Sequence, residues 1–231
     1  MNLLEGRLAL VTGASRGIGA ETAAVLARSG ARVVRVARSL EPGYHDGFED
    51  HACDMADPVA VAGLATAVLA GPGVPDIVVS IAGTFERRPF EQESVETLQR
   101  HLAVNLVGPF ALARGLLPAM LARGSGLHIS LGSVADHTGF PKNSVYSATK
   151  YGLRGLHESL SAEYRGSGVR FTLVSPGPTD TAVWDGDSPE SLAEIRERST
   201  MLRAADVAEA IHFVATRPSH VIIDWLRMGP V

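Results

Sequence analysis

The sequence predicts a single α/β domain, built on a doubly wound sheet of about seven parallel strands with helices on both faces. Three observations support this fold class. Short apolar runs alternate with longer helical stretches along the chain, which is the order of a parallel sheet. The first apolar run leads into a glycine-rich turn and a helix. The length of 231 residues suits one domain with a substantial core.

The composition is that of a globular enzyme and excludes several classes of partner. Hydrophobic residues make up 45% of the chain and charged residues 20%. The net charge of −4 offers no basic surface, so we expect no nucleic acid partner. Cys53 is the only cysteine, which excludes an internal disulfide and fits a reducing cytoplasm. Met1–Leu10 lacks a signal-peptide core, and without a run of about 18 apolar residues we expect no membrane span.

The first strand, turn and helix have the pattern of a dinucleotide-binding site. Leu8–Val11 reads as a strand buried on both faces, and the helix after the turn runs to about Ser29. Glycines allow a pyrophosphate to approach the backbone, and the helix N-terminus offers free N–H groups. The candidate cofactor ligands in this turn are Gly13, Ser15, Arg16, Gly17, Ile18 and Gly19. The alternative is a tight turn in which the glycines serve packing only.

The second strand, Arg32–Ala37, indicates which dinucleotide binds. An NAD site of this kind carries an acidic residue about 20 residues beyond the glycines, where it holds the ribose 2′-hydroxyl. This chain has Arg38 there and Arg16 within the turn, and arginines bind a 2′-phosphate that a carboxylate would repel. We therefore expect NADP(H), with these two arginines as its clamp. Glu41 lies close enough to compete with this interpretation, and Arg35 is expected to be a solvated or interface charge.

The middle of the chain supplies two further strands and two helical stretches. The expected elements are a loop at Glu41–Gly47, a strand at Asp50–Cys53, a helix at Pro58–Ala70 with Asp57 as its N-cap, a strand at Asp76–Ser80, and a helical run, in one piece or two, at Val95–Arg123. Asp54 either contacts the adenine ring or simply ends its strand. Ala82 and Gly83 follow a strand at its carboxyl end, where open α/β sheets bind ligands. Asn105, in an apolar stretch, is typical of a helix bend.

The last third of the chain completes the sheet. The expected elements are strands at Leu127–Leu131, Val169–Val174 and Val221–Asp224, and helices at Tyr146 to about Arg165, Pro189–Ser199 and Ala204–Ala215. A substrate loop or lid is expected at about residues 182–200. Ser133 follows the fifth strand at its carboxyl end. His137 and Trp184 are candidates for substrate contact, and the alternatives are a solvated histidine and a core anchor for the lid.

Tyr146 and Lys150 form the pair with the clearest chemistry. Because they are four residues apart, their side chains lie on one face of a helix. The ammonium favours the phenolate, which predicts a tyrosine pKa below its usual value of about 10. Such a tyrosine can exchange a proton with an alcohol or a carbonyl group. The pair alone is also compatible with an exposed tyrosine beside a solvated lysine.

Taken together, these residues resemble the short-chain dehydrogenase/reductase family. The similarity runs from about Arg7 to Thr181, and more weakly to Asp224. The matching motifs, in order, are Thr12-Gly13-x-x-x-Gly17-x-Gly19, Asp54, Ala82-Gly83, Asn105, Ser133, Tyr146-x-x-x-Lys150 and Pro176-Gly177-x-x-x-Thr181. The resemblance implies a Rossmann sheet and an oxidoreductase that interconverts a small alcohol and its carbonyl compound. The arginines in the turn and after the second strand resemble those of NADP-preferring members.

The resemblance implies a role for each member of the catalytic tetrad. Tyr146 would be the general acid in reduction and the base in oxidation, and Ser133 would hydrogen-bond the substrate oxygen. Lys150 would bind the nicotinamide ribose, and Asn105 would hold a water in a proton relay. The segment from Pro176 would hold the nicotinamide carboxamide. The implied cofactor residues beyond the glycine turn are Arg38, Asp54, Ala82, Gly83, Asn105, Tyr146, Lys150, Pro176, Gly177, Thr179 and Thr181.

Two departures from the family pattern change what we expect. Ser80–Gly83 reads Ser-Ile-Ala-Gly where the family usually has Asn-Asn-Ala-Gly, so we expect a lost hydrogen bond and looser cofactor placement. The chain closes with Asp224–Pro230 in place of the usual Asp-Gly-Gly. This second departure leaves the substrate class and the oligomeric packing open.

Three alternatives to a small-carbonyl oxidoreductase remain. A non-catalytic NADP-binding sensor or scaffold would not need the tyrosine–lysine pair, and a lyase or epimerase could use the same scaffold. A 3-oxoacyl carrier-protein reductase would need a basic surface, for which Arg87, Arg88 and Arg123 are candidates.

The eight histidines show no metal-ligand spacing, so we expect no catalytic metal. The family implies a homodimer or homotetramer that pairs through helices around Val104–Leu121 and Leu153–Tyr164.

Overall fold

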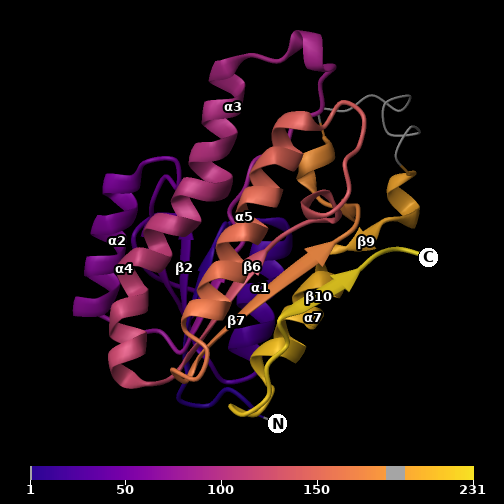
Figure 1. Cartoon of the computed structure of the whole chain (residues 1–231). Helices are drawn as coiled ribbons and strands as arrows, with labels where there is room; N and C mark the ends of the chain where they lie inside the picture. The colour runs from indigo at the N-terminus through magenta and orange to yellow at the C-terminus, as the bar shows by residue number, and fades with distance from the viewer. Residues whose placement is uncertain (1, 186–195) are drawn as a thin grey trace.

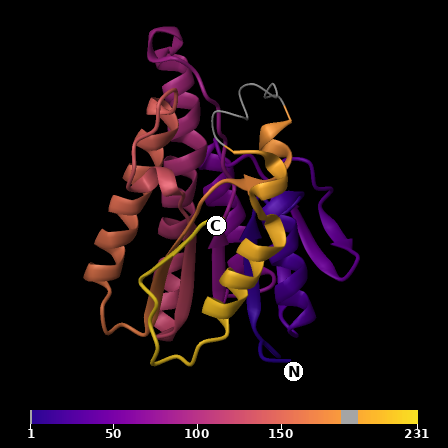
Figure 2. The same cartoon turned by 90° about the vertical axis from the view of Figure 1, so that its right-hand side faces the viewer.

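The computed structural model describes residues 2–185 and 196–231, and its centre is a parallel sheet between two layers of helices (Figure 1, Figure 2). The strands are β1 (Leu8–Thr12), β2 (Arg32–Ala37), β3 (Gly43–His45), β4 (Phe48–Ala52), β5 (Ile77–Ser80), β6 (Gly126–Leu131), β7 (Val169–Pro176) and β10 (Trp225–Met228). Their order across this eight-stranded sheet is β10-β7-β6-β5-β1-β2-β4-β3. Only β3 is antiparallel, in a hairpin with β4 at the edge. The doubly wound parallel fold is therefore confirmed.

Helices cover both faces of the sheet. On one face, α1 (Gly17–Arg28) packs beside α7 (Ala204–Ala215). On the other face lie α2 (Pro58–Ala70), α4 (Gly108–Arg123) and α5 (Ser144–Glu163) (Figure 2). The order in which successive strands are added reverses at the middle of the sheet, because β1 has β2 on one side and β5 on the other. Open α/β sheets bind ligands at such a switch point.

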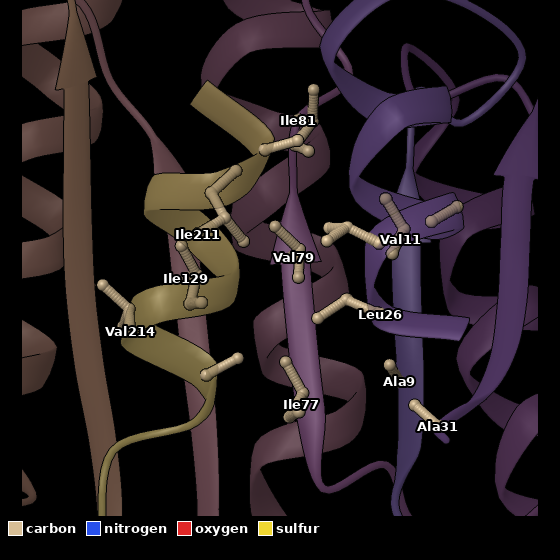
Figure 3. Close-up of a cluster of buried hydrophobic side chains, with 14 of the residues drawn as sticks. Ala9, Val11, Leu26, Ala31, Ile77, Val79, Ile81, Ile129, Ile211 and Val214 are labelled. Atoms are coloured by element: carbon tan, nitrogen blue, oxygen red, sulfur yellow. The ribbon is translucent and has the colours of Figure 1, made fainter. Parts of the chain in front are cut away.

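The core consists of two apolar clusters, one on each side of the sheet. Alternate side chains of one strand belong to different clusters, because successive residues point to opposite faces. In β1, Val11 faces α1 and α7, whereas Leu10 faces α2 and α4. Figure 3 shows the first cluster, in which Val79 of β5 lies between Leu26 of α1 and Ile211 of α7. Both clusters hold the strands rigidly, so the loops at their carboxyl ends start from fixed positions.

The long helical run predicted at Val95–Arg123 is continuous. It consists of α3 (Val95–Leu102), a π-helical turn η2 (Ala103–Val107) and α4. A π-helical turn widens the helix locally, and Asn105 lies within it. Of the residues that the structure describes, this run alone is long and apolar enough to cross a membrane. However, 44% of its most apolar window is buried inside the protein, and the core helix of a soluble protein passes the same test.

Two predictions about the strands are wrong. Glu41–Gly47, expected as a loop, contains β3, which pairs with β4 at the sheet edge. The last strand is β10, which begins directly after the predicted segment Val221–Asp224. Its pairing begins with Trp225 opposite Leu173 of β7, and the predicted segment leads into this register, with the carbonyl oxygen of Asp224 accepting the N–H of Leu173 at 3.0 Å. Ile222, in that segment, is 51% exposed, which the apolar run in the sequence does not reveal.

The expected helix at Pro189–Ser199 and the lid at about 182–200 lie largely outside the described residues. The flanking segments Ala182–Trp184 and Arg198–Thr200 each form a 3-10 turn. Next to them, β8 (Thr179–Asp180) pairs with β9 (Leu202–Arg203) in a separate small sheet. Chain segments from before and after the expected lid are therefore joined at its base.

Candidate active site

A cleft of about 1750 Å³ lies at the carboxyl ends of the strands, at the switch point between β1 and β5. Small-molecule sites usually measure about 300–1,000 Å³, so this cleft has room for a dinucleotide and a substrate together. All the residues that the sequence suggested for cofactor binding and catalysis line it, with the exception of Asn105. Glu41, the competing acidic residue, is exposed and is not part of the lining.

The glycine turn is folded so tightly that Gly13 and Gly19 have no room for side chains. Gly13 has a φ of 69°, and a Cβ there would lie 2.9 Å from the Cα of Ala82. A Cβ on Gly19 would lie 2.1 Å from the carbonyl oxygen of Gly13. No side chain caps the N-terminus of α1, which begins within this turn. Packing alone therefore requires these glycines, and the turn also leaves free N–H groups at the cleft.

The small-residue turn after β5 is anchored from β1. Oγ1 of Thr12 accepts the backbone N–H groups of Ile81 and Ala82, at 3.0 and 3.1 Å. The hydroxyl of Ser80 is buried and has no hydrogen-bond partner. The departure from the family pattern thus leaves an unsatisfied hydroxyl, while Thr12 holds the next two residues in place.

Two arginines at the cleft have no partner in the described part of the chain. Arg16 and Arg38 are both exposed, and neither makes a hydrogen bond or an ion pair there. Arg35, which we expected to be a solvated or interface charge, instead binds Asp50 through Nε at 2.7 Å and Nη2 at 2.6 Å. It also lies 4.2 Å from the ring centroid of Phe48. The two cleft arginines are therefore available for an anionic ligand.

Two aspartates after β4 have separate tasks. Asp54 lines the cleft, and its Oδ1 accepts the backbone N–H of Ala56 at 3.0 Å. Asp57 caps α2 as predicted, because its Oδ1 accepts the N–H groups of Val59 and Ala60, at 2.8 and 3.2 Å. Asp54 therefore both stabilises the turn after its strand and faces the cleft. Its contact with adenine stays a prediction.

Ser133, Tyr146 and Lys150 converge at the other end of the cleft. Tyr146 and Lys150 lie in the first two turns of α5, and Ser133 follows β6. The hydroxyls of Ser133 and Tyr146 are hydrogen-bonded. Nζ of Lys150 lies 5.5 Å from the centroid of the Tyr146 ring and donates to the carbonyl oxygen of Leu131 at 2.8 Å. A hydroxyl, a phenol and an ammonium are thus grouped around one part of the cleft.

The pKa of Tyr146 is raised to about 12, whereas the sequence predicted a lowered value. Loss of solvent around the phenol is the largest cause. The hydrogen bond with Ser133 acts in the opposite direction, and the negative charge of Asp136 raises the pKa further. The pKa of Lys150 is lowered to about 8, because burial outweighs the opposing effect of the negative charge of Asp136. The prediction fails because burial disfavours the charged form of both side chains. Its effect on the pKa of Tyr146 is larger than any stabilisation of the phenolate by the nearby ammonium.

Asn105 connects the loop after β5 to α5. Its Nδ2 donates to the carbonyl oxygen of Thr84 at 2.9 Å and to Oγ1 of Thr149 at 3.0 Å. Its Oδ1 accepts the N–H of Thr84 at 2.8 Å. The side chain is 1% exposed, so it supports the site from behind. The bend suggested by the sequence is the π-helical turn, and the proton relay stays a prediction.

An aromatic cluster forms one wall of the cleft. The ring of Phe85 packs edgewise on Tyr146 and on Trp184, with centroids 4.8 and 5.0 Å apart. Nε1 of Trp184 donates to the carbonyl oxygen of Thr179 at 2.8 Å, and its side chain is buried. Trp184 is therefore an anchor and a lining residue at once. Sequence reasoning missed Phe85, and the available signal was an aromatic residue two positions after Gly83 at the end of the small-residue turn.

The C-terminal segment closes another side of the cleft. The backbone N–H of Gly177 donates to the carbonyl oxygen of Met228 at 2.8 Å. Residues 227–230 line the cleft together with Pro176 and Gly177. His137 also lines it, and its ring packs edgewise on Trp225 with centroids 5.3 Å apart. Substrate contact by His137 stays a prediction.

Sequence reasoning also missed Asp136, a fully buried carboxylate behind Ser133. Nothing in the local pattern distinguishes it from a surface aspartate, because one of its partners, Ser175, comes from the distant strand β7. In the described part of the chain, no group of three or more His, Cys, Asp or Glu could hold a metal ion. Arg123, a candidate for binding a carrier protein, instead donates to the carbonyl oxygens of Val74 and Pro75, at 2.8 and 2.7 Å.

Known proteins resemble this chain along almost its whole length. A family model described as short chain dehydrogenase matches residues 7–191. D-threitol dehydrogenase of Mycolicibacterium smegmatis is 33% identical over 235 residues, covering 95% of this chain and 89% of that protein. A metagenomic short-chain oxidoreductase solved in complex with NADP is 31% identical, with a TM-score of 0.82 and 99% of each chain covered. The closed form of a serine dehydrogenase complexed with NADP+ has a TM-score of 0.87 at 28% identity, covering 96% of this chain and 94% of that one.

Proposed function

The chain belongs to the short-chain dehydrogenase/reductase family of oxidoreductases, and we propose that it interconverts a small alcohol and its carbonyl compound with NADP(H). One observation carries this proposal. Ser133, Tyr146 and Lys150 meet in the same cleft that the glycine turn and two exposed arginines, Arg16 and Arg38, line. The three side chains are chemically unlike, and each has a task in moving a proton to or from a substrate oxygen.

The cleft fits a phosphorylated dinucleotide. The glycines leave no side chain between the cofactor pyrophosphate and the backbone, and the uncapped end of α1 favours an anion. Arg16 and Arg38 would hold the 2′-phosphate, since both guanidinium groups are exposed and have no partner within residues 2–185 and 196–231. The structural neighbours complexed with NADP and NADP+ support this preference. Asp54, Ala82 and Gly83 would contact the adenosine part, and residues 176–181 the nicotinamide carboxamide.

When bound, the nicotinamide supplies or accepts the hydride and, in its oxidised form, adds a positive charge near the phenol. In reduction, Tyr146 donates its proton to the substrate oxygen. Its raised pKa of about 12 keeps this proton on the phenol throughout the neutral range, so the acid is always present. In oxidation, Tyr146 must accept the alcohol proton, and the same raised pKa opposes the required phenolate.

Ser133 and Lys150 orient and stabilise the reacting groups. The backbone N–H of Ala135 donates to Oγ of Ser133 at 3.1 Å, which fixes the position of this hydroxyl. Ser133 can then donate to the substrate oxygen as negative charge develops there. Nζ of Lys150, now bound to the carbonyl oxygen of Leu131, would bind the nicotinamide ribose hydroxyls and hold positive charge near Tyr146. Asn105 would support this part of the site through its contacts with Thr84 and Thr149.

We further propose that the protein is a homodimer or homotetramer. Helices α4 and α5 carry exposed apolar side chains, with Phe110 50% exposed and Tyr151 47% exposed. Such side chains lose contact with water when two copies pair. Light scattering at several protein concentrations measures the mass directly. A monomer at all concentrations would contradict this part of the proposal.

The test of function is NADPH oxidation in the presence of a panel of small aldehydes and ketones, for the wild type and Tyr146→Phe. We expect turnover of at least one carbonyl by the wild type and almost none by the variant. Thermal unfolding with NADPH provides the binding control, since a ligand at about 100 times its dissociation constant adds roughly 2.7 kcal/mol. Binding of NADPH without turnover of any carbonyl or alcohol would favour the sensor or scaffold alternative.

A further inference from the structure

Asp136 is a buried carboxylate that the proposed reaction does not use. It ends the short 3-10 turn after β6, and none of its surface is exposed. Its Oδ2 accepts the backbone N–H of Ser133 at 3.0 Å and the hydroxyl of Ser175 at 2.6 Å. Its Oδ1 accepts Nδ1–H of His137 at 2.7 Å. The hydroxyl of Ser175 in turn accepts Nε1–H of Trp225 at 2.8 Å, so contributions from β7 and β10 hold this carboxylate in place.

The carboxylate has no permanent cation beside it. Within residues 2–185 and 196–231, its one ion-pair partner is His137, which is charged only when protonated. The donors from Ser133 and Ser175 are neutral. A buried carboxylate is costly unless its surroundings compensate for the lost water, and here hydrogen bonds provide that compensation without cancelling the charge. Its field therefore reaches the neighbouring groups of the cleft.

Lys150 is the neighbour for which this field has a chemical consequence. Its side chain is 4% exposed, and burial lowers its pKa to about 8. Asp136 is the carboxylate whose charge counteracts this decrease. The same charge acts on Tyr146 and, further along α5, on His157. Without Asp136, a larger share of Lys150 would lose its proton near neutral pH.

We propose that Asp136 is a positioning residue of the reaction, which fixes Ser133 through its backbone and whose buried negative charge keeps Lys150 protonated. The inference rests on the oxidoreductase function proposed above. The other titratable groups nearby act elsewhere: His137 binds Asp136 itself, and Asp224 and Glu158 act on His157. Asp136 thus acts in two ways: its hydrogen bond with the N–H of Ser133 fixes the backbone there, and its negative charge acts on Lys150.

A purely structural role is the competing explanation, because Asp136 and Ser133 also form a capping box at the 3-10 turn. The chain contains a matched case. Asp206 forms the same kind of capping contact with the N–H of Arg203 at the start of α7, at 2.8 Å, and does not line the cleft. Neutralising Asp206 removes a capping charge without affecting the site. Asp206→Asn is therefore the control for Asp136→Asn.

Asp136→Asn removes the charge and can keep every contact. The new Oδ1 can accept from the N–H of Ser133 and the hydroxyl of Ser175. The new Nδ2 can donate to Nδ1 of His137, if that ring adopts its other neutral tautomer. We therefore expect the variant to fold and to bind NADPH. Circular dichroism and the thermal shift with NADPH check both points.

The chain has only two lysines, Lys142 and Lys150, so the charge of Lys150 can be measured directly. Lysine labelled with ¹³C at Cε gives two NMR signals, and Lys142→Arg identifies the one from Lys150. We expect the midpoint of the Lys150 titration to move to lower pH in Asp136→Asn and to stay unchanged in Asp206→Asn. In the enzyme assay, the pH profile of kcat/KM should move in the same direction, and activity at pH 8 should fall several-fold.

An unchanged Lys150 titration and an unmoved pH profile in Asp136→Asn would overturn the proposal, even if kcat decreased, because only the structural role would remain. Should this variant not fold, Asp136→Gly with added formate repeats the test, with neutral formamide as the control. If formate restores the Lys150 titration and formamide does not, the charge role is supported. If the two compounds restore it equally, the charge role is overturned. The NMR measurement needs no substrate. A wild type without turnover would therefore refute the proposed function, while the titration still decides the role of Asp136.

Discussion

The two ends of the cleft are constructed in different ways. At the phosphate end, where the glycine turn lies, the cleft is lined by glycine backbone and by the exposed Arg16 and Arg38, all within residues 13–38. At the reaction end, Ser133 and Tyr146 are half-buried and Lys150 and Asp136 are buried, and these residues come from the segment after β6 and from α5. There, Lys150 is 4% exposed and Asp136 not at all. The comparison shows that local sequence determines a binding surface, whereas burial and distant partners determine the charge state of a reacting group.

The largest effect is expected at the reaction end, from Tyr146→Phe. The variant keeps the ring that packs on Phe85 but lacks the proton, so turnover should fall about 10²- to 10⁴-fold. The thermal shift with NADPH should remain, because the phosphate end is untouched. Steady-state assays and thermal unfolding measure the two quantities separately. Turnover close to that of the wild type would show that another group transfers the proton.

At the phosphate end, Gly19→Ala should disturb the turn most. The new Cβ would lie 2.1 Å from the carbonyl oxygen of Gly13, so the turn must open. We expect stability to decrease by about 1–3 kcal/mol and NADPH binding to be lost. Gly63→Ala is the matched control, since its helical glycine has open space around it, and it should raise stability by about 0.5–1 kcal/mol. Equal responses of the two variants in thermal unfolding would contradict the tight packing of the turn.

A smaller, selective effect is expected from Arg38→Asp. The change replaces an attraction for the 2′-phosphate by a repulsion, so NADPH affinity should fall by about 10- to 100-fold or more. NADH lacks this phosphate, and its affinity should change little. Arg32→Asp, which changes an exposed arginine at the opposite end of β2, is the control with the same change of charge. Equal weakening of NADPH and NADH would sink the assignment of the 2′-phosphate clamp.

The same contrast explains what could be predicted from sequence. The glycine turn, the cap at Asp57 and the parallel sheet follow from patterns within a few residues, and the structure confirms them. Asp136 could not be found, because Ser175 lies 39 residues away and reaches it only through the sheet. The sequence placed Lys150 beside Tyr146 and predicted a lowered tyrosine pKa. It could not show that burial of both side chains would reverse the shift.

The position of β10 could also not be predicted from the sequence. Val221–Asp224 has the apolar pattern of a strand, but the register of β7 pairs with the next four residues. Trp225, which begins β10, then reaches Ser175 and completes the support of Asp136. The segment whose departure from the family left the substrate open thus contributes to the reaction end. Which substrate fits there depends on side chains from distant parts of the chain, and local patterns do not determine their arrangement.

The smallest expected effect is a pH dependence that separates the two ends. The kcat/KM for NADPH reports ionisations of the free enzyme. Burial lowers the pKa of Lys150 to about 8, so its ammonium is present below this pH and is lost as the pH rises through it. Tyr146, with a pKa of about 12, stays protonated in this range and makes no contribution. We therefore expect kcat/KM for NADPH to decrease above about pH 8, by no more than about tenfold per pH unit.

Lys150→Arg separates this cause from the arginine clamp, because a guanidinium keeps its charge across the whole range. The variant should have lower activity but no decrease around pH 8, while Arg38→Asp should keep that decrease at a reduced NADPH affinity. The profile is measured from pH 6 to 10, with stability checked at each pH. If kcat/KM still decreased above about pH 8 in Lys150→Arg but no longer did so in Arg38→Asp, the titrating group would belong to the phosphate end. It would then be wrong that the charge at the phosphate end is constant over this pH range and that the charge at the reaction end changes.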